Sequence, residues 1–108
     1  MANARVARGR RTQVVIATWL REHGWPLAKS VWGSAPGKDI FDVPGHAIEV
    51  KARSDFDPQA WWRQAKKNAK SGERPCVIVR CNAQGEASPE DYLVFRRLED
   101  DELNKGRS

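Results

Sequence analysis

The chain has 108 residues, a length that favours a single domain over 1–108, and 40% of its residues are hydrophobic, enough for one core. No apolar run approaches the roughly 20 residues that a membrane span needs, and no apolar segment follows the basic N-terminus, so we expect a cytoplasmic protein with no membrane partner. The formal net charge of +5 favours a polyanionic partner, nucleic acid in the first place.

The first third of the chain is predicted to hold one helix and one strand. Residues 1–8 are polar and basic, and we expect a flexible arm there. Apolar residues recur with helical spacing over 10–23, and Gly24 supplies a stop for that helix. A strand over 27–32 and a loop over 33–37 should follow.

The middle of the chain indicates two strands and a second helix. The strands are predicted over 39–43 and 47–51, with Pro44-Gly45-His46 between them. Asp57 is a favourable N-cap, and Pro58 is a favourable first residue for a helix that runs to about Ser71. The predicted buried stripe of this helix consists of Trp62, Ala65 and Ala69.

The last third is predicted to hold two strands and a tail. Residues 75–82 are strongly apolar, and 91–98 alternate between apolar and polar. Residues 99–108 form an acidic and polar tail. The order is therefore α-β-β-β-α-β plus one further strand, which predicts an α/β domain with a central mixed sheet flanked by helices.

One short pattern carries chemistry. Asp39, within Gly37-Lys38-Asp39-Ile40, is followed by Glu49 and Lys51, which share a strand face because they are two residues apart. Two carboxylates can hold a hard divalent cation through oxygen, and the cation polarises a phosphate. A neighbouring lysine stabilises the charge that develops on that phosphate. The trio predicts metal-assisted phosphodiester cleavage, and the alternative is a solvated face with an ordinary Glu/Lys pair.

The connection between these two strands decides whether the three side chains meet. A two-residue turn would place Asp39 opposite Val50, on the wrong face. The three-residue connection Pro44-Gly45-His46 would place Asp39 opposite Lys51 and Phe41 opposite Glu49, so that the trio projects together. The site therefore requires an odd loop or a bulge.

The pattern G-K-D-I followed by E-V-K, between a leading and a following helix, resembles the PD-(D/E)xK nuclease superfamily. It is most similar to the small archaeal-type Holliday junction resolvases and related phage and bacterial endonucleases. The resemblance spans about Gly9 to Val79. It implies a restriction-endonuclease-like core and, as partners, branched DNA and a second copy of the chain, as in DNA recombination and repair.

The resemblance also implies roles for individual residues. Asp39 and Glu49 correspond to metal ligands for Mg²⁺, with Mn²⁺ as a substitute, and Lys51 corresponds to the lysine of the motif. Ser34, in the loop before the aspartate, and Gln64, in the next helix, correspond to further site residues. The metal-ligating position in the first helix, four residues after Gly9, is a glutamate in the resolvases. This chain has Gln13 there, which can still offer an oxygen but no negative charge.

Two basic clusters are candidates for phosphate contact. The first lies near the start of the first helix and comprises Arg5, Arg8, Arg10 and Arg11, with Lys38 as a further candidate beside the motif. The second comprises Arg63, Lys66, Lys67 and Lys70 in the second helix. The alternative for each is a solvated helix face. Either Trp61 or Trp32 could stack on an unpaired base, with core packing as the alternative.

Two other functions stay open from the sequence. One is a nuclease of the same fold that acts on linear or single-stranded DNA in repair or restriction. The other is a catalytically silent DNA-binding module, which Gln13 favours because it weakens the expected charge at the metal.

Overall fold

The computed structural model describes residues 3–31 and 38–107. Its two α-helices and five strands are α1 (Asn3–Glu22), β1 (Lys29–Ser30), β2 (Ile40–Phe41), β3 (His46–Ala52), α2 (Pro58–Asn68), β4 (Arg74–Arg80) and β5 (Leu93–Arg96). Three short 3₁₀ segments follow β4, namely η1 (Pro89–Asp91), η2 (Leu98–Asp100) and η3 (Glu102–Arg107). The strands form one sheet in the order β1-β2-β3-β4-β5, in which only β3 and β4 pair in parallel. The predicted α/β domain with a mixed sheet is confirmed.

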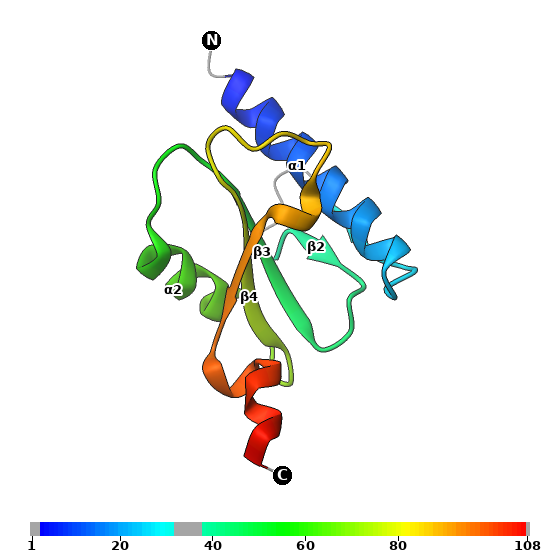
Figure 1. The fold of residues 1–108 in the computed structure, drawn as a ribbon, viewed down its shortest axis with the longest axis vertical. Coiled ribbons are helices and arrows are strands. Elements are labelled where there is room, and N and C mark those ends of the chain that lie inside the picture. The colour runs from blue at the N-terminus through cyan, green and yellow to red at the C-terminus, as the bar shows by residue number, and fades with distance from the viewer. Residues whose placement is uncertain (1–2, 32–37, 108) are drawn as a thin grey trace.

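The helices cover opposite faces of the sheet (Figure 1). Alternate residues of a strand point to opposite faces, so the two central strands feed two cores. On the α1 side, Ile48 and Ile78 pack with Ile16. On the α2 side, Val77 and Val79 pack with Trp61 and Ala65. The α2 crossover thereby joins two parallel neighbours, β3 and β4, in the middle of the sheet.

Helix α1 is longer than predicted. It begins at Asn3, so the expected flexible arm is wrong for the described residues 3–8. Alanine and arginine favour helix in this stretch, and the Arg8 guanidinium donates a hydrogen bond to the Cys81 carbonyl at 3.2 Å, which ties the first turns to the end of β4. The predicted stop is confirmed, because α1 ends at Glu22 and Gly24 takes a φ of +105°.

The first two strands are shorter than predicted. Instead of 27–32 and 39–43, only Lys29–Ser30 and Ile40–Phe41 pair in the sheet. Asp42 ends β2 because its φ of +62° turns the chain out of the extended conformation. The strand predicted over 91–98 is likewise only Leu93–Arg96, since η1 and η2 occupy its two ends.

The predicted buried stripe of α2 is confirmed at Ala65 but wrong at Trp62 and Ala69. Trp61 is 5% exposed and packs with Ala65, whereas Trp62 is only partly buried and lies over Phe95, with ring centroids 6.4 Å apart. Ala69 lies beyond the helix, in an extended C-cap. Because Trp61 is buried, the idea that it stacks on an unpaired base is wrong; Trp32 lies outside the described residues.

The predicted acidic and polar tail forms the 3₁₀ segments η2 and η3 over most of its described residues. Asp100 accepts a hydrogen bond from the Arg97 side chain at 3.0 Å and lies 3.9 Å from the Arg74 guanidinium. These contacts hold η2 against the start of β4, at the end of the sheet away from the N-terminus of α1 (Figure 1). No helix within the described part of the chain is long and apolar enough to cross a membrane.

Candidate active site

Strand β3 supplies two of the predicted site residues. It pairs with β2 on one side and β4 on the other, with Glu49 opposite Val77 and Lys51 opposite Val79. Glu49 and Lys51 therefore point to the α2 side of the sheet, as their spacing of two requires. Glu49 is 2% exposed, and its Oε2 lies 3.9 Å from the Lys51 Nζ. A charged pair thus sits on a central strand, not on a solvated face.

The predicted register between β2 and β3 is wrong by two residues. Ile40 pairs with Ile48, not with Val50 as the predicted connection requires. The reason lies in the turn: the His46 amide donates to the Val43 carbonyl at 3.1 Å, and Gly45 takes a φ of +82° that glycine adopts without strain. His46 is therefore already the first residue of β3. A shift of two residues leaves every side chain on its predicted face.

Asp39 consequently still reaches the pair on β3. Its amide donates to the Ile48 carbonyl at 2.9 Å, and its Oδ2 accepts from the Val50 amide at 2.8 Å. Burial raises the pKa of Asp39, opposed by the Val50 amide and the Lys51 charge. Burial also raises the pKa of Glu49, and the Asp39 charge adds to that shift, opposed by Asn68 and Lys51. Two shielded carboxylates close together make this point of the molecule favourable for a cation.

Helix α2 supplies two amides that hold the β3 pair in place. The Lys51 ammonium donates to the Gln64 Oε1 at 2.8 Å, and the Asn68 amide donates to the Glu49 Oε1 at 3.0 Å. Gln64 and Asn68 are four residues apart, so they lie on one helix face, as Glu49 and Lys51 lie on one strand face. Asn68 was not predicted from the sequence, although its spacing from Gln64 was a signal that could have found it.

Helix α1 completes the site from the other side. Arg5, Gly9 and Gln13 follow one another at intervals of four, and all three line an open cavity of about 330 Å³. The same cavity is lined by Asp39, Glu49, Lys51 and Gln64. The structure therefore brings together five of the predicted site residues, from both helices, from β3 and from the residue just before β2. The sixth, Ser34, lies outside the described residues.

The donor set fits a hard divalent cation. Gln13 is 6% exposed, and its Oε1 has no hydrogen-bond partner. One oxygen of each carboxylate is occupied, Asp39 Oδ2 by an amide and Glu49 Oε1 by Asn68, which leaves the other oxygen of each for a ligand. Carboxylate and amide oxygens are ligands that Mg²⁺ accepts. Within the described ranges no three His, Cys, Asp or Glu side chains gather, so the set is two carboxylates and one amide.

The candidate DNA-binding residues differ in their surroundings. Lys38 forms a largely buried ion pair with Glu73, and Arg11 pairs with Glu86 at 2.8 Å. Arg8 is half-buried against the end of β4, whereas Arg10 on α1 is exposed. The cluster on or just beyond α2 is exposed throughout and comprises Arg63, Lys66, Lys67 and Lys70. The α2 cluster is thus open to a polyanion, while Lys38 would first have to leave its partner.

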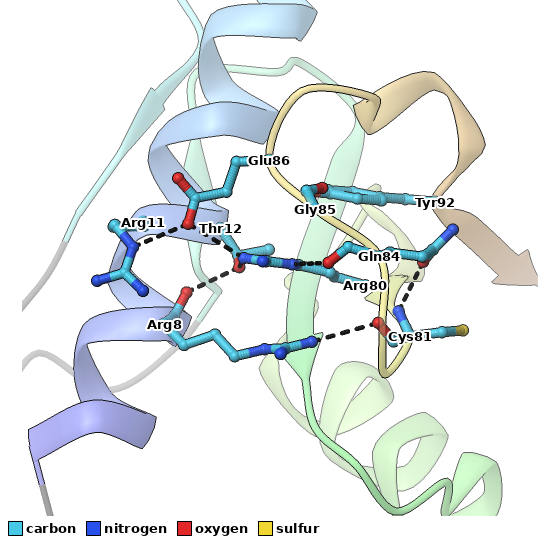
Figure 2. Close-up of polar contacts among 9 residues, drawn as sticks. All are labelled: Arg8, Arg11, Thr12, Arg80, Cys81, Gln84, Gly85, Glu86 and Tyr92. Atoms are coloured by element: carbon cyan, nitrogen blue, oxygen red, sulfur yellow. Dashed lines mark hydrogen bonds and ion pairs between the residues drawn. The ribbon is translucent and has the colours of Figure 1, made fainter.

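A buried arginine fixes α1 against the loop after β4 (Figure 2). Arg80 is 8% exposed; its Nη1 donates to the Thr12 Oγ1 at 3.0 Å, and its Nε donates to the Gln84 carbonyl at 2.8 Å. Glu86 lies 3.3 Å from the same guanidinium. Thr12 precedes Gln13, so this network sets where the α1 wall of the cavity stands. Sequence reasoning missed Arg80, because an isolated arginine in an apolar strand gives no signal of its partners.

Comparison with known proteins found no matching family model, no matching curated protein and no matching solved structure. The resemblance to PD-(D/E)xK nucleases accordingly remains an inference from the motif residues.

Proposed function

We propose that this protein is a Mg²⁺-dependent DNA endonuclease with a restriction-endonuclease-like core. The observation that carries the proposal is the convergence of Asp39, Glu49 and Lys51 on one cavity, together with the unpartnered Gln13. A buried carboxylate pair flanked by a fixed lysine has no evident structural purpose, because ionised groups are costly to bury. The element order and the parallel β3–β4 pair are also those that the resemblance implies.

Each residue then has a role that its contacts support. Asp39 and Glu49 would hold Mg²⁺, or Mn²⁺ in its place, with Gln13 as a third protein ligand. The ion would supply a Lewis acid that polarises the phosphodiester and a water of lowered pKa. Lys51 stabilises the negative charge that grows on the phosphate oxygens during attack. Gln64 restrains the Lys51 ammonium, and the products carry a 5′-phosphate, as the resemblance implies.

The substrate that we propose is a Holliday junction or another branched DNA, cut by a homodimer. A dimer would present two active sites to two symmetric strands. The alternative is a nuclease of the same fold that acts on linear or single-stranded DNA. It differs from the proposed junction-cutting enzyme only in which DNA it cleaves fastest.

The test is a cleavage assay with Mg²⁺ or Mn²⁺ on four-way junctions, linear duplexes and single strands. We expect wild type to nick the junction faster than the linear forms. Asp39→Asn and Glu49→Ala should abolish cleavage but retain DNA binding in Ca²⁺, because the backbone contacts do not need the metal chemistry. Cleavage by either variant at near the wild-type rate would contradict the site assignment.

One observation favours a second candidate, a DNA-binding module without catalysis. The site offers only two carboxylates, since Gln13 stands where the resolvases have an acid. Binding to DNA in Ca²⁺ with no cleavage in either Mg²⁺ or Mn²⁺ would support this candidate over the nuclease.

A further inference from the structure

A second cavity, which the proposed chemistry does not use, adjoins the active-site cavity. It has about 260 Å³ and shares Arg5, Ala52 and Arg53 with the first. Arg8 and Asp55 are among its other lining residues. A cluster of arginines therefore lies next to the carboxylates, at the first turns of α1 and the end of β3.

Arg8 is the most constrained member of this cluster. One of its terminal nitrogens is bound to the Cys81 carbonyl, which holds the side chain across the gap between α1 and β4 (Figure 2). Its Nε is buried and has no hydrogen-bond partner. A buried cationic donor without an acceptor costs free energy, and an anion beside the guanidinium would offset part of that cost through its charge.

The charge in the second cavity is unbalanced. Three guanidinium groups, from Arg5, Arg8 and Arg53, face one carboxylate, that of Asp55. The Arg53 and Asp55 side chains are 3.4 Å apart but 42% and 64% exposed, so their ion pair is weak and easily exchanged. The planar fork of a guanidinium matches phosphate oxygens in geometry as well as charge. The second cavity thus has the chemistry of a phosphate site.

We propose that Arg5, Arg8 and Arg53 form a subsite for an internal phosphodiester of the strand being cut, next to the bond that is hydrolysed. That the bound strand is cut rests on the proposed function, whereas the binding of a phosphodiester by the three arginines does not. Because the two cavities adjoin and share Arg5, Ala52 and Arg53, a strand held by the arginines would place its neighbouring phosphate at Asp39, Glu49 and Lys51. The arginines would act by positioning, which raises the effective concentration of the reacting groups.

The first test measures affinity for DNA in Ca²⁺ over a range of salt concentrations. Arg53→Gln and Arg5→Gln should each weaken binding and reduce the slope of log K against log salt by about 0.9, the value for one lost contact to duplex phosphate. Arg74→Gln is the matched control, because Arg74 lies at the opposite end of β4 with its side chain 62% exposed. Equal behaviour of Arg53→Gln and Arg74→Gln would overturn the subsite.

The second test locates the phosphate. Single methylphosphonates, which are neutral, replace each phosphodiester in turn around the cut site of a DNA without terminal phosphates. We expect one replacement beside the cut to weaken wild-type binding about tenfold, as for one charge-assisted contact. The same replacement should weaken binding by Arg53→Gln distinctly less, because that variant has already lost one of the three arginines at the phosphate. Equal losses in both proteins at every position, or binding that needs a 5′-terminal phosphate, would overturn the proposal.

The two proposals can fail separately. If the effect of one phosphate depends on Arg53 but the protein never cleaves DNA, the subsite is supported and the nuclease proposal is contradicted. If wild type cleaves DNA and no phosphate depends on Arg53, the nuclease proposal is supported and the subsite is contradicted.

Discussion

At the scale of single residues, Glu49 carries the clearest indication of a ligand. It is almost completely buried, yet its partners are one neutral amide and a lysine ammonium 3.9 Å away. A buried charge is normally compensated by close pairing and several hydrogen bonds. Burial raises the pKa of Glu49, and the nearby charge of Asp39 raises it further. Burial also raises the pKa of Asp39. A cation at this point would remove the imbalance.

Lys51 should matter for the rate more than for the fold. We predict that Lys51→Ala lowers the cleavage rate by about 10²-fold or more, the scale for loss of one charge-stabilising group. Lys29→Ala, a change of an exposed lysine in β1 outside both basic clusters, is the control and should leave the rate of the bond-breaking step unchanged. Single-turnover kinetics at saturating protein measure that step, and thermal unfolding checks the fold. An unchanged rate in Lys51→Ala would remove the lysine from the mechanism.

Gln13 offers a test of the proposed metal site. We predict that Gln13→Glu tightens Mg²⁺ binding, because a carboxylate is a charged oxygen ligand and the amide oxygen has no competing partner. Calorimetric titration of Mg²⁺ and the Mg²⁺ dependence of cleavage should both shift to lower concentration. Gln59→Glu, at an exposed position in the first turn of α2, controls for added charge.

Two other results with Gln13→Glu would be informative. Identical titration curves would mean that Gln13 does not face the metal and that the site consists of Asp39, Glu49 and Lys51 alone. Tighter metal binding with a lower rate would mean that the amide orients the attacking water, which a carboxylate misplaces.

At the scale of elements, features that depend on neighbouring residues could be predicted from the sequence. The alignment of one strand against another could not. Asp57 caps α2 as expected, with its Oδ1 accepting from the Ala60 amide at 3.3 Å, because capping depends on adjacent residues only. The β2–β3 register was wrong by two residues, because the φ values of Asp42 and Gly45 set where the chain turns. The face of each strand residue survived that error, since only an odd shift reverses it.

The same distinction holds for the candidate site: residues with a fixed spacing or motif could be predicted, and residues defined by contacts between elements could not. Asp39, Glu49 and Lys51 were found because their spacing fixes the faces, and Gln64 because a motif carries it. Asn68 was missed although its spacing of four from Gln64 places both on one face of α2. Arg53 and Arg80 gave no signal in the sequence, because their roles depend on contacts with other elements.

The ion pair between Lys38 and Glu73 fastens the entry to β2 onto the turn before β4. Burial opposes ionisation of Glu73, but the Lys38 hydrogen bond, the Lys70 amide and the two lysine charges outweigh it and lower the pKa of Glu73. A carboxylate with a lowered pKa in the folded state contributes stability above its ordinary pKa of 4.5, and that contribution is lost as the pH falls through the folded value.

We therefore predict a pH-dependent cost for Glu73→Gln. The free energy of unfolding should fall by about 1 kcal/mol at pH 7, and the difference from wild type should shrink below pH 4.5, where wild type loses the pair as well. Urea unfolding at a series of pH values measures this. Glu90→Gln, at an exposed glutamate in η1, should show no such trend. A cost for Glu73→Gln that grows toward low pH would contradict the ion pair.

At the scale of the whole molecule, the parallel pairing of β3 and β4 gives the two ends of the sheet a different charge environment. Their C-terminal ends, Ala52 and Arg80, lie together beside the arginine cluster. At their N-terminal ends the acids of residues 99–101 are paired with Arg74, Arg96 and Arg97. An approaching polyanion is attracted more strongly to the arginine cluster than to the end where acids and arginines are paired, which favours one orientation of DNA.

Junction cutting by a homodimer makes a prediction about mixed proteins. In solution the 12.2 kDa chain should have about twice that mass by analytical ultracentrifugation. When wild type is mixed with excess Asp39→Asn, most active dimers contain one competent site, so junctions should be nicked once rather than resolved. Two results together would contradict a dimer. The chain would have the mass of a monomer at concentrations at which junctions are resolved, and added Asp39→Asn would leave the ratio of nicked to resolved product unchanged.

The position of Arg80 in the chain also bears on the order in which the candidate site assembles during synthesis. Every residue that we place at the proposed metal or beside it occurs before residue 70, whereas the partners that anchor α1 lie between 80 and 92. A nascent chain thus acquires all of these side chains well before the loop that seats Gln13 among them. A chain that stops before this loop carries the motif residues without the contacts that fix the α1 wall of the cavity.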